Sequence, residues 1–306
     1  MRTIDLGAAG FTVPTLAVGC MRISGDKKME AVRFVEAAMG LGANFFDHAD
    51  IYGAGVCEEI FAKAVSALKL PRDRFFIQSK CGIRPGAAFD FSKGHILSSV
   101  EGSLKRLKTD YLDVLLLHRP DTLMEGEEVA EAFGVLQQTG KVRYFGVSNQ
   151  NPMQIQLLKR YVKQPIVANQ LQLSIANCTM ISQGLHNNMQ DDFAVQRDGG
   201  VLDFCRLNDI TIQPWSPFQK GFFGGVFLDN PEYPDLNKRL GEIAEKYSVS
   251  TTTIALAWIL RHPAKMQPVT GTMKVERLKE CVKATEITLT RDEWYSIFLA
   301  AGNVLP

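Results

Sequence analysis

Four polar side chains stand at or just after the ends of short apolar segments in the amino-terminal part of the chain. Asp47 ends the run NFFD and Tyr52 follows in the next loop, while Lys80 ends RFFIQSK and His118 ends DVLLLH. A free tyrosine has a pKa of about 10, and a neighbouring ammonium group lowers that pKa because it favours the phenolate. A carboxylate beside the lysine keeps the lysine charged, and an imidazole can bind a substrate oxygen or help to pass a proton. The set therefore predicts a proton donor centred on Tyr52.

Each of these residues alone also has an ordinary structural explanation. Asp47 and Lys80 would form a structural ion pair, Tyr52 would be a loop aromatic, and His118 would be a core histidine. Their position at three successive strand ends favours chemistry instead, because active sites of parallel barrels lie at the carboxyl ends of the strands. We expect His48 to face away from Asp47, since side chains alternate along a strand, and to be packed or hydrogen bonded rather than catalytic.

The elements that position these residues are short apolar runs that alternate with amphipathic segments along all 306 residues. This alternation predicts an α/β fold, a (β/α)8 TIM barrel formed by a single domain over 1–306, rather than a doubly wound sheet. The expected strands are 15–20, 44–49, 74–80, 113–118, 143–149, 167–173, 210–216 and 266–271. The expected helices lie near 27–41, 57–69, 93–107, 126–139, 152–161, 199–208, 236–247, 251–261, 275–285 and 290–300.

Three segments outside this alternation have expected roles of their own. Residues 2–13 predict an extra β-hairpin that closes the bottom of the barrel. The connections 174–198 and 217–235 are longer than usual loops, so both are candidate lids at the carboxyl-terminal face. The short tail AGNVLP after the last helix predicts an open pocket with broad specificity.

Composition excludes several classes of function. Hydrophobic residues make up 46% of the chain, charged residues 22%, and the net charge is +1, which is typical of a soluble globular protein and favours neither nucleic acid nor a membrane as partner. No run has the length of a signal peptide or a membrane span. The six cysteines show no CxxC spacing, so we expect reduced thiols in a cytoplasmic protein and no metal site. Rossmann, P-loop and nucleophile-elbow motifs are missing.

The segments around the four polar residues resemble the aldo-keto reductase family, in a bacterial branch of oxidoreductases. The matching segments are FFDHADIYG, QSK, LLLHRP, GVSN at 146–149, NQLQL at 169–173, WSP at 215–217 and GTMKVERLKE at 271–280. They occur in order over essentially the whole chain, which makes the likeness more specific than any single motif. The resemblance implies hydride transfer from a nicotinamide to a carbonyl. It makes Tyr52 the general acid, tuned by Lys80 and Asp47, with His118 orienting the carbonyl.

The resemblance also implies a set of cofactor contacts. Ser148, Asn149 and Gln170 would hydrogen-bond the nicotinamide carboxamide. Trp215 would stack on the nicotinamide ring, although a core tryptophan is the alternative. Gly19, Met21 and Arg22 would approach the ribose or the nicotinamide, and Asp47 is a further implied contact. Ser216, Phe218 and Gly221 would begin the loop that covers the pyrophosphate.

The segment 271–281 bears on which nicotinamide is used. Arg277 can bind a 2′-phosphate as a planar fork, Thr272 can donate to it, and Glu280 would fit the adenine amino group. Compared with family members that prefer NADPH, Gly271 replaces a lysine and Cys281 replaces an asparagine. The resemblance therefore favours NADPH with NADH possible, and a solvated Arg277 is the alternative.

Three functions remain in competition at this stage. The leading one is an NADPH-dependent oxidoreductase that reduces a small-molecule aldehyde or ketone. Lys80 could instead form a Schiff base in a lyase, but that chemistry does not need the cofactor-like series of residues. The third is a protein that binds the cofactor for regulation or redox sensing. The sequence sets neither the substrate nor the oligomeric state.

Overall fold

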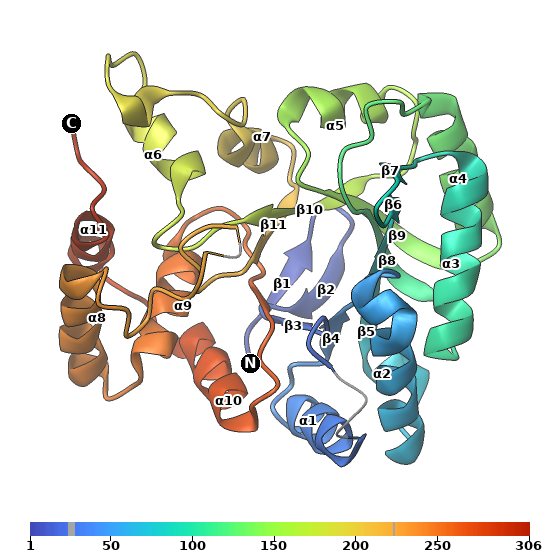
Figure 1. The fold of residues 1–306 in the computed structure, drawn as a ribbon, viewed down its shortest axis with the longest axis horizontal. Coiled ribbons are helices and arrows are strands. Elements are labelled where there is room, and N and C mark those ends of the chain that lie inside the picture. Colours follow the sequence, from blue (N-terminus) through green and yellow to red (C-terminus); the bar gives the residue numbers. More distant parts are fainter. Residues whose placement is uncertain (24–27, 223) are drawn as a thin grey trace.

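The computed structural model describes residues 1–23, 28–222 and 224–306. At the centre of this part of the chain lies a closed barrel of parallel strands, ordered β10-β11-β12-β3-β4-β5-β8-β9 (Figure 1). The barrel strands are β3 (Ala17–Gly19), β4 (Phe45–Asp47), β5 (Phe76–Cys81), β8 (Leu112–Leu117), β9 (Val142–Ser148), β10 (Ile166–Gln172), β11 (Thr211–Trp215) and β12 (Val269–Thr270). Every one overlaps its expected range, so the prediction of a (β/α)8 barrel is confirmed.

The helices surround this barrel and match the expected ranges within a few residues. They are α1 (Lys28–Gly40), α2 (Val56–Ala67), α3 (Lys93–Leu107), α4 (Gly126–Gln138), α5 (Pro152–Lys159), α7 (Val201–Leu207), α8 (Pro234–Tyr247), α9 (Thr251–Arg261), α10 (Val275–Lys283) and α11 (Arg291–Ala300). The expected start of the first helix, residue 27, lies outside the described residues. Side-chain caps fix several starts; Asn151 and Gln154, for example, form a capping box at α5.

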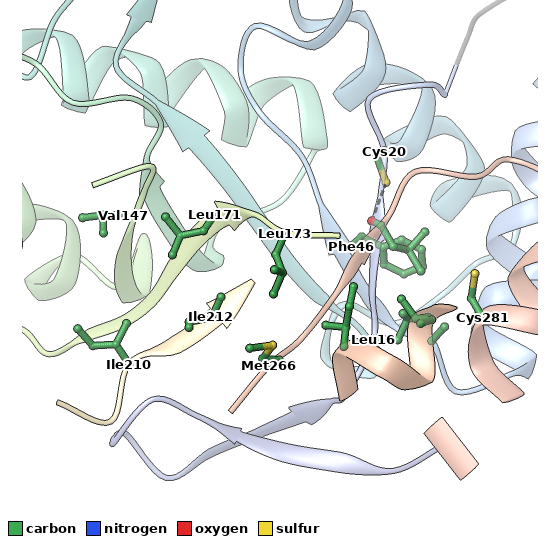
Figure 2. Close-up of a cluster of buried hydrophobic side chains, with 14 of the residues drawn as sticks. Leu16, Cys20, Phe46, Val147, Leu171, Leu173, Ile210, Ile212, Met266 and Cys281 are labelled. Atoms are coloured by element: carbon green, nitrogen blue, oxygen red, sulfur yellow. Dashed lines mark hydrogen bonds between the residues drawn. The ribbon is translucent and has the colours of Figure 1, made fainter. Parts of the chain in front are cut away.

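The alternation of side chains along the strands divides the core into two layers. In β4, Phe45 packs inside the barrel while the next residue, Phe46, packs outward beneath the helices. Figure 2 shows part of the outer layer, in which side chains from β9, β10 and β11 meet residues next to β3 and β12. This period of two is the physical basis of the strand predictions.

The predicted hairpin is present and covers one end of the barrel. Strands β1 (Thr3–Leu6) and β2 (Phe11–Pro14) pair antiparallel. Leu6 and Val13 pack against Phe45 and Val167, which lie near the starts of their strands. A Cβ on Gly7 would lie 2.7 Å from the Cα of Val167, so only glycine allows this approach. The hairpin therefore closes the amino-terminal end and leaves the carboxyl ends open.

Two small features were not predicted. A second hairpin, β6 (Ile83–Arg84) with β7 (Ala88–Phe89), follows β5, and helix α6 (Thr179–Leu185) lies within the long connection 174–198. Both are too short for a periodic pattern to stand out. The α6 segment holds the carboxyl-terminal tail, because the ring of His186 bonds the carbonyl of Val304 at 2.9 Å.

Candidate active site

A cavity of about 1340 Å³ opens at the carboxyl ends of the barrel strands. Most of the residues singled out in the sequence line it. They are Gly19, Met21, Arg22, Asp47, Tyr52, His118, Ser148, Asn149, Gln170, Trp215, Ser216, Phe218, Gly271, Thr272 and Arg277. The structure thus brings together residues that are up to about 260 positions apart, from seven of the barrel strands or the loops that follow them.

Lys80 lies directly beneath the floor of this cavity and is fully buried. Its Nζ donates to Asp47 Oδ2 at 2.8 Å and to Tyr52 Oη at 3.1 Å. It also donates to the backbone carbonyl of His48 at 2.8 Å. An ammonium has three N–H donors, and all three have partners. Lys80 is therefore a fixed positive charge that joins a buried carboxylate to the phenol.

The electrostatic balance at Tyr52 differs from the sequence expectation. Burial raises the pKa of the Tyr52 phenol more than the Lys80 ammonium lowers it, so the net direction is upward. Burial also lowers the pKa of Lys80, but Asp47 and Tyr52 outweigh this effect and raise it overall. The resting site consequently holds a protonated tyrosine beside a charged lysine, and Lys80 offsets part of the cost that burial adds to forming the phenolate.

His118 completes this cluster as a neutral imidazole. Its ring lies edge-on to Tyr52, with 6.0 Å between ring centres. Burial, and then the positive charges of Lys80 and Arg119, hold the pKa of His118 well below its usual range. A neutral imidazole at the cavity wall can donate a hydrogen bond to a substrate oxygen without adding charge.

A layer of buried glutamines supports Asp47 from inside the barrel, and no sequence pattern indicated it. Gln78 and Gln170 both donate to Asp47 Oδ1, at 2.6 and 3.1 Å. Gln213 accepts from both of these amides and donates to Gln267 at 2.9 Å. With Lys80 on its other oxygen, the Asp47 carboxylate has hydrogen-bond donors on both oxygens, which a buried charge requires.

His48 packs outward, as strand alternation predicts. Its ring contacts Phe61 with 4.7 Å between ring centres, and neither ring nitrogen has a hydrogen-bond partner among the described residues. Burial and then Lys80 lower the pKa of His48 to about 3. Of the two environments expected, packed or hydrogen bonded, the structure shows the packed one.

His48→Leu is therefore expected to reduce the loss of stability on acidification. A histidine whose folded pKa is lowered contributes full stability above its unfolded pKa of about 6.5 and loses about 1.4 kcal/mol per pH unit as the pH falls towards the folded value. The stability of His48→Leu relative to wild type should thus improve by about 2 kcal/mol between about pH 7 and pH 5. Urea unfolding at both pH values measures this difference.

The stability of His48→Leu must be compared with that of the wild type at each pH, because Asp50 changes the pH dependence of both proteins in the opposite direction to His48. Burial and Glu58 raise the pKa of Asp50 to about 6, so its ionisation destabilises the fold as the pH rises through that value. His95→Leu, on the outer helix α3, is the matched control. A relative stability of His48→Leu that does not change with pH would contradict the assignment.

The residues expected near a nicotinamide are connected to one another. Trp215 Nε1 donates to Asn149 Oδ1 at 3.1 Å, and Asn149 Nδ2 donates to Ser148 Oγ at 2.7 Å. Asn149 and Ser216 have φ values of +55° and +51°. Such left-handed conformations are uncommon for non-glycine residues and cluster at functional sites. An aromatic face beside fixed amide and hydroxyl groups fits a nicotinamide ring with its carboxamide.

At the far side of the cavity, Arg22 lies beside the glycine at 271. Arg22 Nη1 donates to the Gly271 carbonyl at 3.0 Å, and a Cβ on Gly271 would meet that nitrogen at 2.9 Å. A guanidinium group therefore stands beside the position where the resemblance expects a lysine. Arg277 is exposed and Thr272 half-buried at the same edge.

Three of the expected cofactor contacts do not line the cavity. Cys281 is fully buried in the outer core, on the same face of α10 as Leu278 and Val282 (Figure 2). Its side chain belongs to the core and not to the cavity lining, so the structure does not place Cys281 among the residues that could contact a cofactor. Glu280 and Gly221 also lie outside the cavity lining.

The two long connections behave differently. The 217–235 connection lines the cavity with Pro217, Phe218, Gln219, Phe222, Val226, Leu228 and Asp229. No described residue of 174–198 reaches the cavity. Other lining residues that sequence reasoning missed are Ile51, Gly53, Ile83, Phe89, Arg119, Pro120, Thr252 and Val269. Of these, Arg119 could have been predicted from the sequence, because it is a charged residue directly after His118 at a strand end.

The sequence matches the model of the aldo/keto reductase family over residues 15–298. The chain belongs to the aldo/keto reductase family. Its relatives include the oxidoreductase YcsN of Bacillus subtilis, at 37% identity over 89% of this chain and 88% of the relative. The oxidoreductase YdhF of Escherichia coli is 35% identical over 98% of both chains. A 6-dehydroglucose reductase of Agrobacterium fabrum is 34% identical over 88% of this chain and 87% of the relative.

A solved structure shares the whole architecture. The thermostable aldo-keto reductase Tm1743, crystallised with the inhibitor epalrestat, superposes with a TM-score of 0.80 at 29% identity, over 98% of this chain and 100% of that one. As an aldo/keto reductase, the protein is an oxidoreductase that uses a nicotinamide cofactor. In the described residues, no helix of this aldo/keto reductase is long and apolar enough to cross a membrane.

Proposed function

We propose that this aldo/keto reductase reduces aldehyde or ketone carbonyls with NADPH and that Tyr52 is its general acid. The observation that carries the proposal is the buried ammonium of Lys80, which bonds both Asp47 and Tyr52 at the floor of the cavity. A phenol in this position is protonated at rest and has a cation 3.1 Å away to stabilise the phenolate that remains after proton transfer.

The residues of this chain then have separate tasks. Tyr52 Oη gives its proton to the oxygen of the carbonyl group as negative charge develops there. The neutral imidazole of His118 donates a hydrogen bond to the same oxygen and orients it. Lys80 stays charged throughout, because Asp47 and the backbone of His48 hold it when Tyr52 becomes negative. Trp215, Ser148, Asn149 and Gln170 would hold a nicotinamide, which would supply the hydride chemistry.

Two alternatives are less well supported by the same contacts. A Schiff-base lyase needs a neutral, accessible lysine amine, but Lys80 is fully buried, its three donors have partners, and its pKa is raised. A regulatory or redox-sensing protein would also bind the cofactor, and if it sensed through a cysteine it would need a low thiol pKa. Burial instead raises the pKa of all six free cysteines, to about 11 for Cys178 and to about 12 for Cys205 and Cys281. Free thiols are also consistent with a cytoplasmic location, which we include in the proposal.

The test of the proposed function is the oxidation of NADPH by the purified protein with a panel of small aldehydes. Turnover of several aldehydes is expected, and the consumption of cofactor should match the alcohol formed. If NADPH binds and no aldehyde is reduced, a regulatory protein becomes the better explanation. A borohydride-trapped adduct on Lys80 would instead support the lyase.

The preference for NADPH depends on the 2′-phosphate contacts at the edge of the cavity. Arg277→Met is expected to weaken NADPH binding about tenfold or more and to change NADH binding less than about twofold, because an arginine fork binds the phosphate through charge-assisted hydrogen bonds. Titration calorimetry of the two cofactors measures both values without turnover.

Arg291→Met, at the exposed start of α11, is the matched control for the loss of one positive charge. It should leave both affinities unchanged. Equal weakening of NADPH and NADH by Arg277→Met, or a wild type that binds NADH as tightly as NADPH, would remove the proposed preference.

A further inference from the structure

An arginine that the proposed reaction does not use faces the same cavity. Arg119 directly follows His118 at the carboxyl end of β8, is half-buried, and lines the cavity. Its guanidinium carbon lies 5.8 Å from the ring centre of Trp215 and 5.8 Å from that of Phe222. These two rings contact each other edge to face, with 6.1 Å between their centres, so the cation lies beside an aromatic pair at the cavity wall.

No carboxylate in the described part of the chain forms an ion pair with Arg119, and none of its N–H groups has a hydrogen-bond acceptor there. Two other half-buried arginines differ in this respect. Arg72 donates to Asp113 at 2.6 Å, and Arg106 donates to Glu58 at 2.8 Å. A guanidinium has five N–H donors, and leaving them without acceptors after partial removal from water is costly. Burial accordingly lowers the pKa of Arg119, although the group stays charged at neutral pH.

The position of Arg119 in the barrel separates it from the phosphate end of the cavity. In the closed strand order, β8 and β12 are divided by three strands on either side, so they stand opposite each other. The residues expected at a 2′-phosphate, Gly271, Thr272 and Arg277, follow β12. Arg119 follows β8 and lies beside Tyr52 and His118, where the carbonyl substrate reacts.

The cavity wall on the side of Arg119 is apolar. Ile83 and Phe89 belong to the β6–β7 hairpin, which follows the neighbouring strand β5, and Pro120 is the residue after Arg119. A single unpaired cation in an apolar and aromatic wall is suited to a ligand with an apolar body and one negative group, because the negative group supplies the acceptors that the chain lacks.

We propose that Arg119 is the anion receptor of the substrate site and that this enzyme selects carbonyl compounds that carry an acidic group. The proposal rests on the proposed reductase function for the position of the carbonyl. The guanidinium fork pairs with a carboxylate or a phosphate of the substrate while the carbonyl oxygen lies between Tyr52 and His118. Trp215 and Phe222 hold the fork in place through their ring faces.

The test compares 4-carboxybenzaldehyde with 4-carbamoylbenzaldehyde, which has nearly the same shape and no charge. For the wild type, kcat/KM with NADPH is expected to be at least about tenfold higher for the carboxylate, mainly through KM. Arg119→Gln should reduce the ratio to about one by lowering the value for the carboxylate alone, and Arg119→Lys should keep part of the preference. 4-Formylphenyl phosphate distinguishes a phosphate preference from a carboxylate preference.

Binding measurements make the result independent of turnover. Calorimetric titration of the same aldehydes into the protein with NADP⁺ should show the same preference in Kd, and the affinity of Arg119→Gln for NADPH should stay within about twofold of wild type. Arg84→Gln, on β6 and paired with Asp90, is the control for a general change in charge. Equal binding of the two aldehydes by the wild type, or a preference that survives in Arg119→Gln, would overturn the proposal. A preference in binding without reduction of either aldehyde would instead refute the reductase function and keep the anion receptor.

Discussion

Tyr52→Phe is expected to lower kcat for the reduction of aldehydes by about 1,000-fold, while the Kd of NADPH stays within about twofold of wild type. The phenylalanine ring keeps the shape of the side chain and the edge contact with His118, which has 6.0 Å between ring centres. The substitution removes only the hydroxyl, and with it the proton donor of the proposed reaction. Steady-state kinetics and calorimetry on the same preparation measure both quantities.

The controls for this variant separate chemistry from folding. Tyr295→Phe, on the outer helix α11, removes a hydroxyl far from the cavity and should leave kcat unchanged. Tyr52→Phe should unfold at nearly the wild-type urea concentration, since Lys80 keeps its bonds to Asp47 and to the carbonyl of His48. More than about a tenth of wild-type kcat in Tyr52→Phe would show that another group supplies the proton.

Lys80→Met is expected to abolish activity and also to destabilise the fold by about 3–5 kcal/mol. The two effects have different causes. Activity falls because the Tyr52 phenolate loses the cation that stabilises it. Stability falls because Asp47, only 2% exposed, becomes a buried charge without a counter-ion. Urea unfolding and NADPH-dependent kinetics measure the two losses separately.

The double variant Asp47→Asn/Lys80→Met tests this explanation. Asparagine removes the unpaired charge, so the double variant should recover most of the lost stability but none of the activity. Gln78 and Gln170 can remain as hydrogen-bond partners at position 47, because either amide can turn its oxygen or its nitrogen towards the asparagine. If the two single effects simply add, then Asp47 and Lys80 do not form a coupled pair, and the proposed role of Lys80 is wrong.

Much of the fold was predictable because its signals are local. Apolar runs of strand length, amphipathic segments of helix length and polar residues at strand ends all lie within short stretches of chain. The places of Asp47, Tyr52, Lys80 and His118 follow from chain order alone, since the carboxyl ends of successive parallel strands meet at one rim. The features that escaped prediction, α6 and the β6–β7 hairpin, are too short to show a period.

The cofactor contacts were predictable only in part, because a residue can reach the cavity only if it lies on the side of its helix that faces the cavity. Arg277 and Cys281 lie on the same short helix, α10, and a resemblance by sequence position assigns both to the cofactor. The structure turns Cys281 into the core with Leu278 and leaves Arg277 at the cavity edge. The face of α10 that turns into the core is set by its packing against α9 and α1, which sequence position does not report.

The sequence by itself determined the family, the barrel and the identity of the four polar residues at its rim, because these depend on residue types and on their order. Only the tertiary structure decided how those residues behave. It set the direction of the Tyr52 pKa, since burial competes there with the charge of Lys80. It also assembled the glutamine layer beneath Asp47 and left Arg119 beside Trp215 and Phe222 with no carboxylate partner among the described residues. Each of these properties comes from neighbours on different strands, and electrostatic and packing energies depend on those distances rather than on separation along the chain.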